Sequence, residues 1–358
     1  MKSRQLPTAL VLGLAIAATG WSADFEIAVN RVSARTAVFT GGPWANAIVA
    51  VATPKGVVVV DAPFSRTISG GFRAAIEKEF QRSDFACLIN THEHACHVSG
   101  NEAYADLPIV GHASIRADML KSMEDPAHQF STASLLRLCD SQVKNAREYF
   151  EKNDPARLQT PQWADYEKCW QLIATDLHEG HVTVPPTITF DRQMNLHFGP
   201  VSVRLDYYGC AHGVGDTIVT FPEENLVVTA GLFYAKVVPT IHPSAIPTAA
   251  MVDNWMVVLH ELLRRTDEHT LFCTSHGGTP LTQAQIEADL SYLERLWAEL
   301  RRAKPTGETL EQLKTRLALS AYFPSMAGCN NSSLVGTEWE IRDIHGQNID
   351  ILWQALAL

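Results

Sequence analysis

Short apolar segments separated by turn-forming residues recur in two parts of the chain. Residues 47–52 and 57–60 are apolar and β-rich, and the residues between them, Thr53-Pro54-Lys55-Gly56, are typical of a turn. This pair is predicted to form a hairpin whose second strand, a run of valines, is buried. Further strands are expected at residues 87–90, 107–110, 187–190, 196–198, 201–207, 217–221, 226–229 and 270–274.

Other segments have helical periodicity. Residues 249–265 carry apolar side chains at helical spacing, which predicts an amphipathic helix. Its buried face is expected to hold Met251, Trp255, Val258, Leu259 and Leu262. Capping-box sequences predict two later helices, one beginning at Thr282 and one at Thr309. Helices are also expected at 70–80, 131–153 and 163–177.

The order of these elements predicts the fold class. Strands followed by a helix, and then the same order again, favour an α/β sandwich with helices on its outer faces. Residues 113–185 differ from the rest, because they are richer in Lys, Glu, Gln and Asp and carry helical periodicity. We interpret them as a helical insertion that could form a lid over a site. No linker divides the chain into independent domains.

Composition and charge restrict the class of partner. The chain has 358 residues, 46% of them hydrophobic and 19% charged, which is typical of a globular protein rather than a disordered one. The net charge of −10, without a cluster of Lys and Arg, argues against nucleic acid, since phosphates require a positive surface. Nucleic acid is therefore not an expected partner.

The first 23 residues resemble an export signal. Lys2 and Arg4 precede an apolar run at residues 8–19, and small residues follow as far as Ala23. The run is shorter than the roughly 20 residues that a membrane-spanning helix needs. We expect cleavage near Ala23 and a periplasmic or secreted protein with no membrane span; a retained N-terminal anchor is the alternative.

The cysteine count is odd for an exported protein. Seven cysteines are present, at 87, 96, 139, 169, 210, 273 and 329. Cys139 and Cys169 both fall in the insertion, so a disulfide between two of its helices is one expectation. Cys96 is set apart because it lies in a histidine-rich loop.

That loop is the strongest chemical signal in the chain. Its sequence, Thr91-His92-Glu93-His94-Ala95-Cys96-His97, directly follows the strand expected at 87–90. His212 and His276 also follow predicted strands, and glycines lie beside both. Imidazole and thiolate are preferred zinc ligands, so loops that meet at one edge of a sheet sandwich would form a zinc site.

These motifs resemble those of the metallo-β-lactamase superfamily, over about residues 30–280. The family pattern is His-x-His-x-Asp-His, a distant His in a glycine-rich turn and a final His-Gly, preceded by a strand that ends in Asp, here Asp61. The resemblance implies a four-layer αββα sandwich at 24–280 with a helical C-terminal extension at 281–358. It also implies one zinc site at His92, His94 and His212, and a second that includes His97 and His276.

Two departures from the family pattern bear on the metals. Cys96 replaces a metal-binding Asp, and Leu232 stands where many hydrolases of the superfamily have a bridging Asp. The remaining set looks most like the third subclass of metallo-β-lactamases. A thiolate at Cys96 could complete a second zinc site with His97 and His276. One functional zinc, or a degenerate site, are the alternatives.

The resemblance implies an exported hydrolase that has one or two Zn²⁺ ions per chain and acts on a small-molecule substrate. Zinc-bound hydroxide would cleave a cyclic amide, an ester or a related acyl bond, with β-lactams first among the substrate classes. Asp61 and Asp216 would support the ligand loops from behind. Lactonase, thioesterase and sulfur-ester hydrolase activities remain open, as does a catalytically altered binding protein; an iron-dependent redox enzyme is disfavoured. Tyr208 and Tyr234 are candidates to line the pocket, although structural roles are favoured for both.

Overall fold

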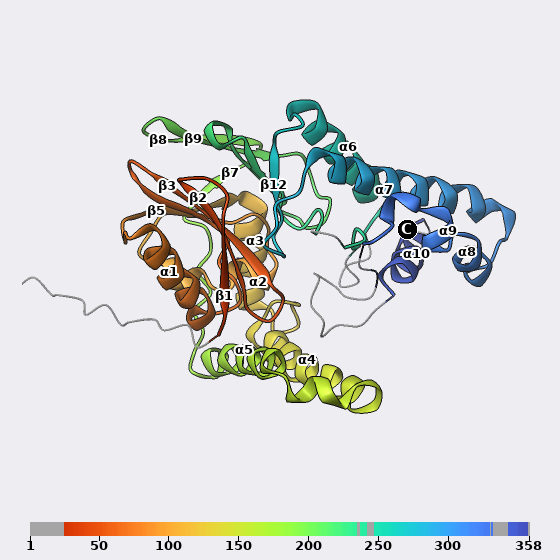
Figure 1. Cartoon of the computed structure of the whole chain (residues 1–358), viewed down its shortest axis with the longest axis horizontal. Coiled ribbons are helices and arrows are strands. Elements are labelled where there is room, and N and C mark those ends of the chain that lie inside the picture. Colours follow the sequence, from red (N-terminus) through yellow and green to blue (C-terminus); the bar gives the residue numbers. More distant parts are fainter. Residues whose placement is uncertain (1–24, 235–236, 242–246, 330, 332–342, 357–358) are drawn as a thin grey trace, which may run out of the picture.

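The computed structural model describes residues 25–234, 237–241, 247–329, 331 and 343–356 (Figure 1). The expected signal segment at 1–23 lies outside the described residues. Among the described residues, no helix combines the length and the apolar character that crossing a bilayer requires.

The first half of the chain forms a seven-stranded sheet in sequence order. The first four strands pair antiparallel and the last three add in parallel. The expected hairpin is its centre, and every residue of the valine strand β4 is buried. The strands are β1 (Ile27–Arg31), β2 (Thr36–Gly41), β3 (Asn46–Thr53), β4 (Gly56–Val60), β5 (Phe85–Ile89), β6 (Ile109–His112) and β7 (Ile188–Phe190).

A second sheet of five strands has the order β12-β11-β10-β9-β8. Its members are β8 (Gln193–Phe198), β9 (Val201–Tyr207), β10 (Thr217–Phe221), β11 (Leu226–Val228) and β12 (Leu271–Cys273). Apolar side chains from both sheets form one buried cluster, with Val49 and Val58 from the first sheet and Val203 and Val219 from the second. The two sheets therefore pack face to face, as in a sandwich.

Helices cover the outer faces of both sheets. Helix α1 (Arg66–Phe80) begins at the N-cap Ser65 and buries Phe72 and Ile76 in a cluster with the first sheet. Helices α6 (Ala249–Arg265) and α7 (Gln283–Ala303) pack in another cluster that includes Val227 and Phe272 of the second sheet. Figure 1 shows α1 beside the strands of the first sheet and α6 with α7 on the side of β12. The predicted four-layer αββα sandwich is confirmed.

Residues 113–185 form helices, as expected. Between β6 and β7 lie α3 (Ala113–Glu124), α4 (Thr132–Asn153), η2 (Pro155–Gln159) and α5 (Pro161–His178). After α7 the chain continues through η4 (Lys304–Thr306), α8 (Leu310–Arg316), α9 (Leu319–Tyr322), η5 (Pro324–Met326) and α10 (Ile344–Ala355). The remaining short helices are α2 (Ala95–Val98), η1 (Asn101–Tyr104) and η3 (Pro222–Glu224). Both predicted capping boxes are present, at the start of α7 and of α8.

Two details of the sequence predictions are wrong. On α6, Val252 is buried with Trp255, whereas Met251 in the first turn is only half-buried. All seven cysteines are free thiols, so the expected disulfide between Cys139 and Cys169 is absent. Both thiols instead pack as small apolar groups in the cluster under α4 and α5, where burial raises their pKa values to about 12.

Candidate metal centre

The histidine-rich motif at residues 91–97 follows β5 and ends in the four-residue helix α2. The sequence predicts a plain loop here, but the backbone N–H groups of His97 and Val98 both donate to the carbonyl of His94. This helical turn places Cys96 and His97 on α2, while His92 and His94 lie on the non-helical segment before it. One short segment therefore supplies donor atoms to two different groups.

His92, His94 and His212 form the first donor group. Their candidate donor atoms, one from each residue, all lie within 4.8 Å of one another. His94 Nδ1 and His212 Nε2 are 3.2 Å apart. Tetrahedral zinc with Zn–N bonds of roughly 2.0–2.1 Å separates its nitrogen ligands by about 3.3–3.4 Å. The donor set and its spacing therefore fit a zinc ion.

The tautomer of His92 follows from its hydrogen bonds. The Thr91 hydroxyl has a single hydrogen, which it donates to Asp61 Oδ2 at 2.8 Å. His92 Nδ1 lies 2.9 Å from the same hydroxyl oxygen and must therefore be the donor in that contact. Nε2 is then the nitrogen of His92 that carries the lone pair a metal requires.

Cys96, His97 and His276 form the second donor group, again within 4.8 Å. His97 Nε2 and His276 Nε2 are 3.1 Å apart. His276 Nδ1 donates to the Trp44 carbonyl at 2.8 Å, because a carbonyl oxygen can only accept. Both Nε2 atoms therefore face the same point, and the thiol completes a set that suits zinc.

Asp61 contacts both donor groups through hydrogen bonds, to Thr91 beside His92 and to the ring of His97. Its carboxylate accepts hydrogen bonds from the Thr91 backbone N–H at 2.8 Å and from His97 Nδ1 at 3.1 Å. The backbone of Asp61 has a φ of 70°, a left-handed conformation that is uncommon outside glycine and is often found at functional sites. Burial raises the pKa of Asp61 to about 7, although the Thr91 hydrogen bonds oppose the shift.

Cys96 is buried and held through its backbone. Its carbonyl accepts a hydrogen bond from Asn46 Nδ2 at 2.8 Å. Burial and the nearby Asp61 raise the pKa of the thiol above its usual range. A thiolate at this position therefore requires a cation beside it.

Two buried carboxylates hold the turn that carries His212. Asp216 accepts hydrogen bonds from the backbone N–H groups of Ala211 and His212, at 2.9 and 2.7 Å, as its predicted supporting role requires. Glu93, which the sequence analysis did not select, accepts from Val214 at 2.9 Å and Gly215 at 3.1 Å. Glu93 belongs to the motif that carries His92 and His94, so it ties the two loops of the first donor group together.

Among the described residues 229–234, which follow β11, no carboxylate joins the candidate metal ligands. Leu232 is fully buried and belongs to the apolar cluster under α6 and α7. Gly231, beside Leu232, allows the ring of His212 to lie close to the backbone, because a Cβ at position 231 would lie 2.4 Å from His212 Nε2. The ring of Tyr234 lies 5.3 Å from that of His276, centroid to centroid, which places it beside the site. Tyr208, in contrast, lies under the guanidinium of Arg265.

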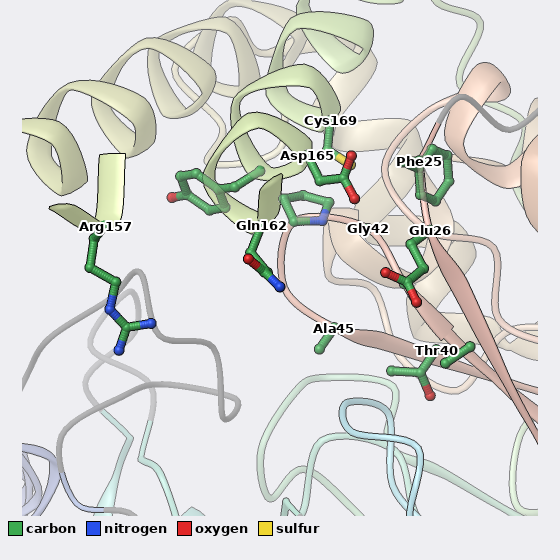
Figure 2. Close-up of a pocket in the computed structure, with 13 residues that line it drawn as sticks. Phe25, Glu26, Thr40, Gly42, Ala45, Arg157, Gln162, Asp165 and Cys169 are labelled. Carbon is green, nitrogen blue, oxygen red and sulfur yellow. The ribbon is translucent and has the colours of Figure 1, made fainter. Parts of the chain in front are cut away.

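Two hollows are candidate substrate sites. A cavity of about 390 Å³ is lined by His94 and Cys96 together with residues of α4. A groove of about 510 Å³ lies between the β1–β2 edge and α5, where Gln162 and Asp165 face Glu26 and Thr40 (Figure 2). None of the six candidate metal ligands lines the groove, so the cavity is the better candidate for a substrate site.

An αββα sandwich with clustered imidazoles at its strand ends is the architecture of a metal-binding hydrolase. The chain belongs to the metallo-beta-lactamase superfamily, whose family model matches residues 41–276. Its fold resembles that of a sec-alkylsulfatase from Pseudomonas sp., with 11% identity and a TM-score of 0.57 over 92% of this chain and 50% of that one. This chain thus spans about half the length of the sulfatase.

A metallo-beta-lactamase from Pontibacter korlensis is also similar in structure. It shares 14% identity with a TM-score of 0.49, over 75% of this chain and 99% of that one. No curated protein sequence matches this chain. The comparisons therefore establish the superfamily and the fold.

Proposed function

We propose that this protein is an exported zinc-dependent hydrolase that cleaves a cyclic amide, an ester or a related acyl bond. The observation that carries the proposal is the presence of two groups of three buried donors, His92, His94, His212 and Cys96, His97, His276. Their imidazole spacings of 3.2 and 3.1 Å fit tetrahedral zinc. Zinc, when bound, would supply a Lewis acid and a bound water whose pKa is lowered to about 7.

The residues around the donors prepare them for this role. Asp61 orients His97 directly and His92 through the Thr91 hydroxyl. Glu93 and Asp216 hold the turn of His212 by accepting its backbone N–H groups. A hydrogen bond from the second ring nitrogen of a ligand histidine fixes the ring orientation and makes the ligand nitrogen more basic. The backbone contacts of Glu93 and Asp216 position the turn. Several of the six donors are thus held by contacts within the protein itself.

Among acyl substrates, β-lactams are the first class that we propose. The support is the donor set itself. Leu232 occupies the position of a bridging Asp and His97 provides an imidazole, as in the third subclass of metallo-β-lactamases. Lactones and thioesters are attacked by the same chemistry and belong in the same assay. Fold alone does not determine the substrate.

Sulfate-ester hydrolysis is a second candidate. The sec-alkylsulfatase shares its fold with 92% of this chain, a span that reaches beyond the matched family region. The apolar lining of the cavity beside His94 would suit an alkyl or aryl ester. A non-catalytic binding protein with a metal but without turnover is the candidate from another class.

A metal titration with a substrate panel tests these alternatives. Zinc content per chain would be measured together with hydrolysis of a chromogenic β-lactam, a lactone series, a thioester series and alkyl sulfates. We expect turnover that a chelator abolishes and zinc restores. Bound zinc without turnover of any panel member would favour the binding protein.

Export is proposed from the N-terminal sequence. A basic start followed by the apolar run at 8–19 supports cleavage near Ala23. Intact-mass measurement of the protein recovered from the periplasm of an expression host would test it. A mass that retains residues 1–23 would contradict cleavage.

A further inference from the structure

The cavity beside the first donor group joins two parts of the fold. One part of its lining, here called the floor, consists of His94, Ala95 and Cys96 at the start of α2, and another part consists of residues of helix α4 in the insertion. Its volume of about 390 Å³ lies within the range of roughly 300–1,000 Å³ that is typical of small-molecule sites. A molecule in this cavity would contact the candidate metal ligands and the insertion together.

Most of the lining is aromatic or aliphatic. Trp44 and Phe64 pack edge to face with ring centroids 5.2 Å apart, and Phe130 lies 5.3 Å from the ring of His94. Leu135 and Leu138 of α4 complete this lining. Burying an apolar group against these side chains would favour binding, because apolar surface of both the ligand and the protein is removed from contact with water.

One cation faces this apolar lining. Arg137 of α4 lines the cavity and donates from Nη2 to the Ser134 hydroxyl at 2.8 Å. The other α4 cations for which ion pairs are known are Lys144, paired with Glu148, and Arg147, paired with Glu167. No ion pair engages Arg137 within the described part of the chain. Its planar guanidinium is suited to a carboxylate or sulfate oxygen pair.

We propose that the cavity selects substrates that carry both an apolar group and an anionic group. The apolar group would pack against Phe64, Phe130 and Leu138, and the anionic group would pair with Arg137. His94 and Cys96 at the floor would then be next to the reacting bond, a part of the proposal that rests on the proposed hydrolase function. Arg137 is thereby assigned a role in substrate specificity, from a helix outside the donor loops.

Calorimetric binding of 4-phenylbutyrate and of neutral 4-phenylbutanol to the zinc-loaded protein tests this inference without turnover. We expect the carboxylate to bind more tightly than the alcohol. Arg137→Gln should weaken carboxylate binding by about 5- to 10-fold, since a charge-assisted pair is lost, and leave alcohol binding unchanged. Lys144→Gln, which removes an exposed cation from the same helix, is the matched control and should change neither.

A second variant tests the apolar lining. Leu138→Gln should weaken both ligands, because it places a polar group against their shared apolar part. Direct coordination of the carboxylate by zinc would contribute equally to its affinity in Arg137→Gln and in Lys144→Gln. The difference in carboxylate affinity between these two variants therefore measures the contribution of Arg137. Equal affinities in these two variants, or equal affinities of the two ligands, would overturn the anion site. Binding of neither ligand would overturn the cavity as a site.

These outcomes are separable from those of the hydrolase proposal. If the two ligands bind as expected but no panel substrate is turned over, the cavity assignment stands and the hydrolase proposal fails. If turnover occurs and Arg137→Gln leaves kcat/KM unchanged for anionic and neutral esters alike, the hydrolase proposal stands and the specificity role of Arg137 fails.

Discussion

Gly231 lies directly against the ring of His212, and a Cβ at position 231 would come within 2.3 Å of His212 Cδ2 and 2.4 Å of Nε2. No real Cβ contact is so short, so a side chain here must displace the ring. The glycine therefore has a steric function toward the first donor group, and its conformational freedom is secondary.

Gly231→Ala should weaken zinc binding at the first group while the protein remains folded. We expect a loss of zinc affinity of at least about tenfold, comparable to the loss of a supporting contact around a metal ligand. Competition with a chromogenic chelator would measure it. Thermal melting of the metal-stripped variant provides the control, and unchanged zinc affinity would show that the ring of His212 is not a ligand.

Alanine at His94 or His212 should remove zinc and activity together. Each change deletes one of three donors, and loss of the metal's several kcal/mol of transition-state stabilisation predicts at least about 100-fold lower kcat/KM. Metal analysis and the substrate panel would measure both. His197→Ala, an exposed position on β8, is the control and should retain both properties. Full zinc stoichiometry in His94→Ala and His212→Ala would defeat the ligand assignment.

Cys96→Ala should lower the zinc content from two ions to one per chain. The thiol is one of only three donors in its group, whereas Cys96→Asp replaces it with another ligand and should keep two ions. Cys87→Ala removes a buried thiol from β5 and should have no effect. One zinc in the wild type and two in the Asp variant would show instead that the thiol does not bind metal.

Glu93→Gln should loosen the turn of His212. The carboxylate accepts the Val214 and Gly215 backbone N–H groups with its two separate oxygens, and an amide offers only one acceptor oxygen. An unsatisfied buried N–H costs about 1–3 kcal/mol, so we expect lower thermal stability and weaker zinc binding. Differential scanning calorimetry with and without zinc would measure both effects. Glu148→Gln, on the exposed face of α4, is the matched control; equal melting temperatures for the two variants would refute the role of Glu93.

The parts of the fold that depend on local pattern were predictable. The valine strand β4, the hairpin before it, helix α6 and both capping boxes follow from short-range spacing, and the structure contains them. Helix α10 was not predicted, because Gly346 and the polar residues around it weaken its helical signal. The grouping of the histidines into two sites came from the resemblance to the family pattern and not from their spacing alone.

The contacts that support the site were harder to predict, because they join distant segments. The Trp44 carbonyl meets His276 across 232 positions, and Asn46 meets the carbonyl of Cys96 across 50. A backbone carbonyl has no sequence signature, and Glu93 occupies a position between two histidines that the motif leaves undefined. Arg137 is one of many basic residues on predicted helices until packing places it at a cavity.

The candidate ligands come from loops of both sheets. His92 and His94 follow a strand of the first sheet, while His212 and His276 follow strands of the second. An ion bound there would act as a crosslink between the two halves of the chain, so metal occupancy and resistance to unfolding should be thermodynamically linked. In a metal-poor environment, lower metal occupancy would therefore reduce the free energy of unfolding as well as the number of filled sites.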